Sequence, residues 1–120
     1  MNIEQHRMKA LRIERSLDRL TDADFEAVIE GAMLAGTHWF NVLLHRKGLF
    51  PETRDAMHAE FLTVGERRRV AAVSPAALAA LDTIEAFRTV QVRGDMPGGM
   101  QAAKSARECL AQLRDAATSA

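Results

Sequence analysis

Three polar residues, His38, Asn41 and His45, follow one another at intervals of three and four positions. On an α-helix this spacing places all three side chains on one side. Imidazole and amide groups in such a stripe could contact a small ligand or RNA, hold a metal ion, or satisfy the polar groups of a neighbouring helix or subunit. We predict that this set of residues, the His38 stripe, lines a ligand-binding site.

Helix geometry argues against a metal ion held by the two histidines of the stripe. His38 and His45 are seven positions apart, which is about 10 Å along a helix axis. Two imidazoles on one zinc ion need nitrogens within about 4 Å of each other, because each Zn–N bond is ~2 Å long. The helical ligand spacings His-Glu-x-x-His and Glu-x-x-His are also absent. We therefore expect neither a metal site nor a cofactor.

Arg54 and His58 form a second candidate site. The apolar spacing predicts a short helix over residues 52–62, and on it these two residues, four positions apart, share one face. A histidine beside an arginine could act as acid or base while the guanidinium holds a phosphate charge. The alternative is a solvated pair on the surface of an amphipathic helix.

The elements that must position these residues are helices. Apolar residues recur at intervals of three and four over four stretches, residues 3–20, 22–47, 75–92 and 99–117. The capping pair Thr63 and Glu66 and the start signal Ser74-Pro75 mark further helix ends. No stretch alternates as a strand does. The sequence predicts one all-α domain over residues 1–120, a four-helix up-and-down bundle with one or two short extra helices between its second and third main helices.

His6 is the only polar member of the apolar seam of the first helix. Because it lies near the end of the chain, we expect its side chain to be partly solvated.

The helix over residues 22–47 is apolar on two sides. Phe25, Trp39 and Leu43 belong to its core face, but Leu34 and Leu44 lie on the opposite side. A helix that is apolar around much of its circumference is usually covered by other parts of the protein on more than one side. Its small residues, Gly31 and Ala35, would allow a second helix to approach closely. We therefore predict a homodimer through this helix.

The composition excludes several classes of function. Sixteen basic residues balance sixteen acidic ones, whereas a dedicated DNA-binding surface needs a basic excess. A single cysteine, Cys109, rules out an internal disulfide. No run of about 20 apolar residues predicts a membrane span, and the N-terminus lacks the apolar core of a signal peptide. We expect a cytoplasmic protein that does not enter a membrane.

The helix Ala35–His45, with the sequence AGTHWFNVLLH, lies inside this small predicted bundle and resembles the HEPN superfamily. The resemblance implies a dimer that is either a ribonuclease or a binding module. Active members carry an Arg, a polar residue after it, and a His with four to six residues between. Here Asp55 follows Arg54, but His58 comes after only three intervening residues.

The motif comparison leaves three hypotheses. We expect a non-catalytic module of the HEPN type that binds a partner, a nucleotide or RNA. One alternative is a metal-independent ribonuclease that uses Arg54 and His58. The other is a purely structural dimer.

Overall fold

Five α-helices and two shorter helical segments make up the fold, which contains no strand. The computed structural model describes all residues from 1 to 120. The α-helices are α1 (Ile3–Leu17), α2 (Phe25–Arg46), α3 (Val64–Val73), α4 (Pro75–Phe87) and α5 (Gly99–Thr118). A 3-10 turn spans Ala59–Phe61, and a π-helical segment, Arg88–Arg93, follows α4 directly. The prediction of an all-α chain is confirmed.

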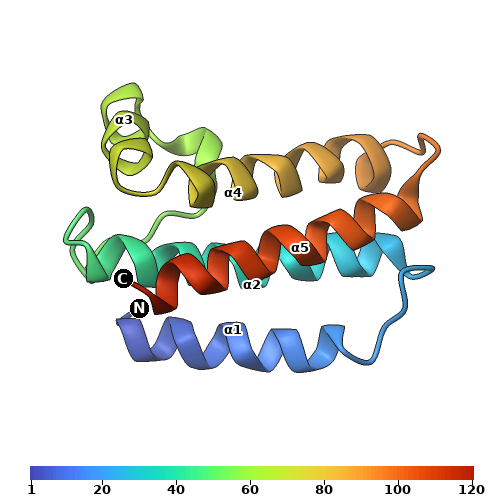
Figure 1. Cartoon of the computed structure of the whole chain (residues 1–120), viewed down its shortest axis with the longest axis horizontal. Helices are drawn as coiled ribbons and strands as arrows, with labels where there is room; N and C mark the ends of the chain where they lie inside the picture. Colours follow the sequence, from blue (N-terminus) through green and yellow to red (C-terminus); the bar gives the residue numbers. More distant parts are fainter.

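Helix α2 lies at the centre of the molecule, in contact with α1, α4 and α5. In Figure 1 these four long helices lie along the long axis, and α3 lies at one end. By length and composition alone α2 could cross a membrane. However, 67% of its most apolar stretch is buried inside the protein, as is common for the core helix of a soluble domain.

Local signals in the sequence set most of the helix ends. Asn2 caps α1 and Thr63 caps α3, each in a reciprocal capping box with the residue three positions later. Ser74 caps α4, with Pro75 in its first turn. After α2, Gly48 has a φ of +66°, a left-handed conformation that glycine adopts without strain.

The segment between α2 and α3 differs from the prediction. Local spacing predicts a helix over residues 52–62, but residues 51–58 run as a turn and extended chain, and only Ala59–Phe61 is helical. The side chain of Asn41 binds both backbone polar groups of Ala56, which a helix would need for its own hydrogen bonds. Tertiary hydrogen bonds thus override the local pattern, and Arg54 and His58 do not share a helix face.

The protein's own chain covers α2 on most sides. A Cβ atom added to Gly31 would lie 2.4 Å from Cδ2 of Leu17, so the small residue serves the contact between α1 and α2. Ala35 is fully buried, and Asn41 is buried beneath residues 51–58. Leu34, which is 51% exposed, is the large apolar residue of α2 that is left to solvent.

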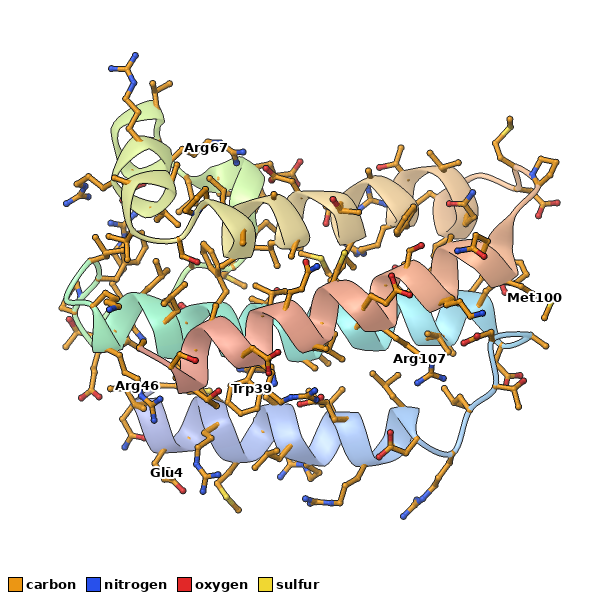
Figure 2. All side chains as sticks on the ribbon, in the orientation of Figure 1. Glu4, Trp39, Arg46, Arg67, Met100 and Arg107 are labelled. Atoms are coloured by element: carbon orange, nitrogen blue, oxygen red, sulfur yellow. The ribbon has the colours of Figure 1, made fainter.

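Polar contacts tie α1 and α5 together beside α2. The indole of Trp39, which Figure 2 shows between α1 and α5, donates a hydrogen bond to Glu14 of α1. Glu14 also pairs with Arg114 of α5. Just beyond the C-terminal end of α1, Arg107 reaches from α5 to Asp22 in the connection between α1 and α2. These contacts fix the position of α1, which carries His6.

Candidate functional site

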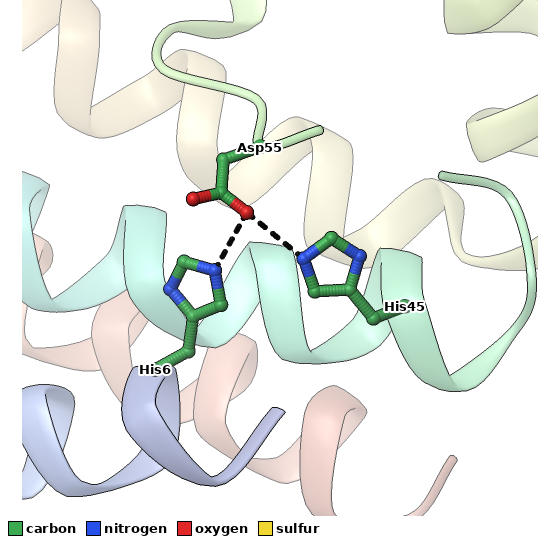
Figure 3. Close-up of side chains that lie close together, drawn as sticks. All are labelled: His6, His45 and Asp55. Carbon is green, nitrogen blue, oxygen red and sulfur yellow. Dashed lines mark hydrogen bonds and ion pairs between the residues drawn. The ribbon is translucent and has the colours of Figure 1, made fainter. Parts of the chain in front are cut away.

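Three histidines and one carboxylate from three separate segments meet beside α2. His6 comes from α1, His38 and His45 from α2, and Asp55 from the segment between α2 and α3. Figure 3 shows His6 and His45 pointing at the carboxylate of Asp55. The Nε2 atoms of His6 and His45 lie 2.9 and 3.0 Å from the same oxygen, Oδ1 of Asp55.

Both ring nitrogens of His45 face oxygen acceptors. Nδ1 lies 3.1 Å from the backbone carbonyl of Phe50, and Nε2 faces the Asp55 carboxylate. The side chain has no exposed surface, so water cannot replace either partner. A neutral imidazole carries a single N–H and can donate to only one of the two oxygens. A neutral His45 therefore leaves one of its two ring nitrogens facing an oxygen with no proton between them.

His6 connects this cluster to His38. Their Nδ1 atoms are 2.9 Å apart, so one nitrogen donates a hydrogen bond and the other accepts it. When Nε2–H of His6 donates to Asp55, Nδ1 of His6 must accept, and His38 carries its proton on Nδ1. The Nε2 atom of His38, which makes no hydrogen bond within the protein, is then a free acceptor.

Burial and hydrogen bonding set the charges of the cluster. Partial burial opposes ionisation of Asp55, but hydrogen bonds from His6, the amino group of Met1 and His45 outweigh it and lower the pKa of Asp55 to about 2. Burial lowers the pKa of His6 even though Asp55 opposes the shift. Burial, followed by the charge of His6, lowers the pKa of His38 to about 4. At neutral pH Asp55 is ionised and His38 is a neutral imidazole.

The cluster borders a pocket of about 560 Å³. His6, His38 and Asp55 all line it. So do Arg88 and Glu30, which form an ion pair with an N–O distance of 3.0 Å. Its apolar lining comes from four residues, Met33, Leu34, Ala56 and Met57. The volume lies within the range of about 300–1,000 Å³ typical of small-molecule sites, which likewise combine apolar walls with a few polar groups.

The structure gives the residues of the His38 stripe different surroundings. His38 lines the pocket. Asn41 also lines it, but its amide is already engaged with the backbone of Thr37 and Ala56. His45 does not line the pocket and instead binds Asp55 and Phe50. Of the three, only His38 has a free ring nitrogen to offer a ligand.

Arg54 and His58 are not paired with each other. Arg54 lies over the ring of Phe50 and forms an ion pair of 2.6 Å with Glu66. His58 turns its Nδ1 towards Glu85, at 3.8 Å. Both border a small hollow of about 120 Å³, and His58 also lines the pocket of about 560 Å³. The guanidinium charge that a phosphate would need is already balanced by Glu66.

Sequence reasoning missed Asp55 and misjudged His6. Contrary to the expected partial solvation, His6 is only 1% exposed, because α2 and the segment that carries Asp55 enclose it. One signal was available, since a lone histidine in an otherwise apolar seam indicates a buried polar partner. No comparable signal marks Asp55, which the sequence shows only as the polar neighbour of Arg54.

Two groups of side chains bring possible metal ligands within 4.8 Å of one another. His6, His45 and Asp55 form the first group, and both of its histidines are buried. His58, Glu60 and Glu85 form the second, in which Glu60 is exposed. Ligand spacing within one helix opposes a metal ion held by His38 and His45, whereas the first group combines three segments.

No family model, curated protein or solved structure matches this chain. The HEPN resemblance therefore stays a prediction.

Proposed function

We propose that this chain is a non-catalytic binding module whose pocket beside His38 takes a nucleotide-sized ligand. The observation that carries the proposal is the pocket of about 560 Å³ bordered by a neutral His38 whose ring is fixed by His6. A ring held in one orientation loses little freedom when it binds, which favours a specific ligand.

The lining of the pocket suits a molecule with one flat apolar part and one polar end. Met33, Leu34 and Met57 offer apolar side chains against which a base could pack. Nε2 of His38 offers a hydrogen-bonding atom that makes no hydrogen bond within the protein. A nucleotide combines both features.

A non-catalytic role is favoured over the ribonuclease alternative. The predicted catalytic pair needs a free arginine, and Arg54 is engaged by Glu66 and Phe50. We further propose the finer architecture, in which the four long helices form an up-and-down bundle of the HEPN type. In this proposal two copies associate through the part of α2 that bears Leu34, which is exposed at the edge of the pocket.

A thermal-shift titration with adenosine, guanosine, cytidine and uridine monophosphates tests this function. At a ligand concentration of about 100 Kd, binding stabilises the folded state by about 2.7 kcal/mol, and we expect a matching rise in Tm with at least one nucleotide. His38→Ala should abolish the rise, and Arg68→Ala, at an exposed site on α3, should preserve it. No rise with any of the four, or an equal rise in His38→Ala, would overturn the proposal.

Incubation with RNA in the presence of EDTA separates the alternatives. We expect the RNA to stay intact. Cleavage that is lost in His58→Ala would favour the metal-independent ribonuclease instead. A chain that neither cleaves RNA nor binds a nucleotide, yet sediments at twice the monomer mass, would favour the purely structural dimer.

A further inference from the structure

We infer that His6, His45 and Asp55 bind one divalent transition-metal ion, which presents an open coordination position to the pocket. Two imidazoles and one carboxylate are a common ligand set for zinc and for non-haem iron. The metal site itself is independent of the proposed function. The class of ligand that we assign to the open coordination position does rest on the proposed function and deepens it.

The ligand atoms are already gathered around a single point. Nε2 of His6 and Nε2 of His45 converge on Oδ1 of Asp55 at 2.9 and 3.0 Å (Figure 3). Around a tetrahedral zinc ion with bonds of ~2.0–2.1 Å, neighbouring ligand atoms lie about 3.3 Å apart. The two N–O distances therefore need to open by only a few tenths of an ångström to admit the ion, and the two Nε2 atoms lie within 4.8 Å of each other.

The outer hydrogen bonds are those that metal-bound histidines require. A ligating imidazole normally donates its other N–H to a carbonyl, a carboxylate or another acceptor, which fixes the tautomer and the ring. Nδ1 of His45 faces the carbonyl of Phe50 at 3.1 Å. Nδ1 of His6 faces Nδ1 of His38 at 2.9 Å. In both rings, donation of the Nδ1 proton to this partner would leave the lone pair on Nε2, directed at the point where the ion would lie.

A metal ion also resolves the mismatch of donors at His45. With Nδ1–H bound to Phe50, the Nε2 lone pair would otherwise point at an oxygen of the Asp55 carboxylate, so that two acceptors face each other. A cation between them turns this repulsion into two coordinate bonds. Because the His45 side chain is fully buried, solvent cannot supply the missing donor.

The second group of possible ligands lacks these properties. Glu85 is already held by Arg88, with an N–O distance of 2.9 Å, and Arg93 lies nearby. Glu60 is exposed, and Nδ1 of His58 has no hydrogen-bond partner to orient the ring. We therefore place the ion at His6, His45 and Asp55.

The open position defines the class of ligand. Three protein ligands leave at least one coordination site free on zinc, as in catalytic and ligand-binding centres. His6 and Asp55 line the pocket and His45 does not, so the free position faces the pocket. A small molecule with a phosphate or carboxylate oxygen could bind the metal there, while its apolar part lies against Met33 and Leu34.

Metal binding would also change what His38 offers to that molecule. With the ion on Nε2 of His6, the proton of His6 moves to Nδ1 and is donated to Nδ1 of His38. The proton of His38 then lies on Nε2. The free nitrogen of His38 thereby becomes a hydrogen-bond donor, which matches an anionic oxygen.

Calorimetric titration of the full chain with Zn²⁺, after removal of metals with EDTA, tests the site. We expect one ion per chain. His45→Gln and Asp55→Asn should each weaken binding at least about 100-fold, more than the 10–100-fold typical of losing an outer partner. The matched variant His58→Gln should bind like the wild type. Absence of binding, wild-type affinity in Asp55→Asn, or loss of binding in His58→Gln would overturn the inference.

Two further measurements keep the test decisive if a ligand variant fails to fold. His38→Ala keeps all three ligands and should weaken Zn²⁺ binding about 10–100-fold, whereas unchanged affinity would contradict the outer-partner role. Co²⁺ bound to the wild type should give the intense visible absorption of a four- or five-coordinate site. A spectrum identical to that of free hexaaqua Co²⁺ would overturn the site.

The metal inference and the proposed function can fail separately. Zn²⁺ binding without any Tm shift from nucleotides would leave the metal site standing and overturn the function. Nucleotide binding to the metal-free chain, with no Zn²⁺ uptake, would leave the proposed function standing and overturn the metal site.

Discussion

The side chain of Asn41 pairs with the backbone of Ala56 through two hydrogen bonds of 2.7 Å, one accepted by Oδ1 from the N–H and one donated by Nδ2 to the C=O. This pairing holds residues 51–58 extended against α2. It also places Asp55, the preceding residue, beside His6 and His45. A single amide on α2 thus positions a carboxylate that no local pattern would direct there.

Replacing Asn41 by alanine should therefore destabilise the protein and loosen the site. Asn41→Ala leaves the buried N–H and C=O of Ala56 without partners, and each unsatisfied group costs about 1–3 kcal/mol. We expect the free energy of unfolding to fall by about 2–4 kcal/mol in urea denaturation. Gln101→Ala, at an exposed position of α5, should change it by less than about 0.5 kcal/mol. An equally small effect of Asn41→Ala would mean that the pairing does not hold the segment.

Gly31 and Gly65 should respond in opposite directions to alanine. A Cβ at Gly31 would lie 2.4 Å from Cδ2 and 3.2 Å from Cγ of Leu17, so Leu17 must repack. Overpacking of this kind outweighs the gain in helix propensity, and we expect a loss of about 1–2 kcal/mol. A Cβ at Gly65 meets nothing within 4 Å, so Gly65→Ala should stabilise α3 by up to about 1 kcal/mol. Thermal unfolding of the two variants gives the comparison, and a stabilised Gly31→Ala would contradict the close contact of α1 and α2.

Glu66 should make the protein sensitive to acid. Hydrogen bonds from Arg54 and from the backbone of Thr63 lower the pKa of Glu66 from its ordinary value of 4.5 to about 2. Because the pKa is depressed in the folded state, the stabilisation is complete above about pH 4.5 and is lost as the pH falls towards 2. Glu66→Gln should flatten the dependence of stability on pH in this window. If both proteins lose stability in parallel between pH 4.5 and 2, Glu66 is not the titrating group.

Sequence patterns were sufficient for the four long helices and for part of the site. The starts of α3 and α4 follow from the caps Thr63 and Ser74, which act through hydrogen bonds within a few residues. His38 was found because its spacing from Asn41 and His45 is a local property of one helix.

The remaining site residues depend on contacts that local patterns do not encode. The apolar residues of the segment 51–58 are spaced as in a helix. The hydrogen bonds from Asn41, which is distant in the sequence, keep the segment extended. Asp55 therefore reaches the histidines through a tertiary contact between residues ten and 49 positions apart. The burial of His6 likewise depends on what packs against α1 and not on its place near the chain end.

The homodimer expected because α2 is apolar on two sides stays a prediction. The structure leaves a smaller part of α2 exposed for contact with a second copy. Because α1 and residues 51–58 cover Gly31 and Asn41, the exposed Leu34 is the part of α2 left for a second copy. Sedimentation at micromolar concentration should give twice the monomer mass, and Leu34→Glu should give the monomer. Val90→Glu, at another exposed apolar residue, should leave the mass unchanged. A monomeric wild type would contradict the dimer.

The most direct test of the central claim, that His6, His45 and Asp55 meet in one buried cluster, is a long-range ¹H–¹⁵N NMR spectrum of the four histidines. It should be recorded before and after addition of one equivalent of Zn²⁺. We expect the metal-loaded His45 to carry its proton on Nδ1, facing Phe50. Zn²⁺ should shift the Nε2 signals of His6 and His45 and leave His58 unchanged. Four histidines that titrate and respond to Zn²⁺ alike, as solvent-exposed side chains do, would contradict the account.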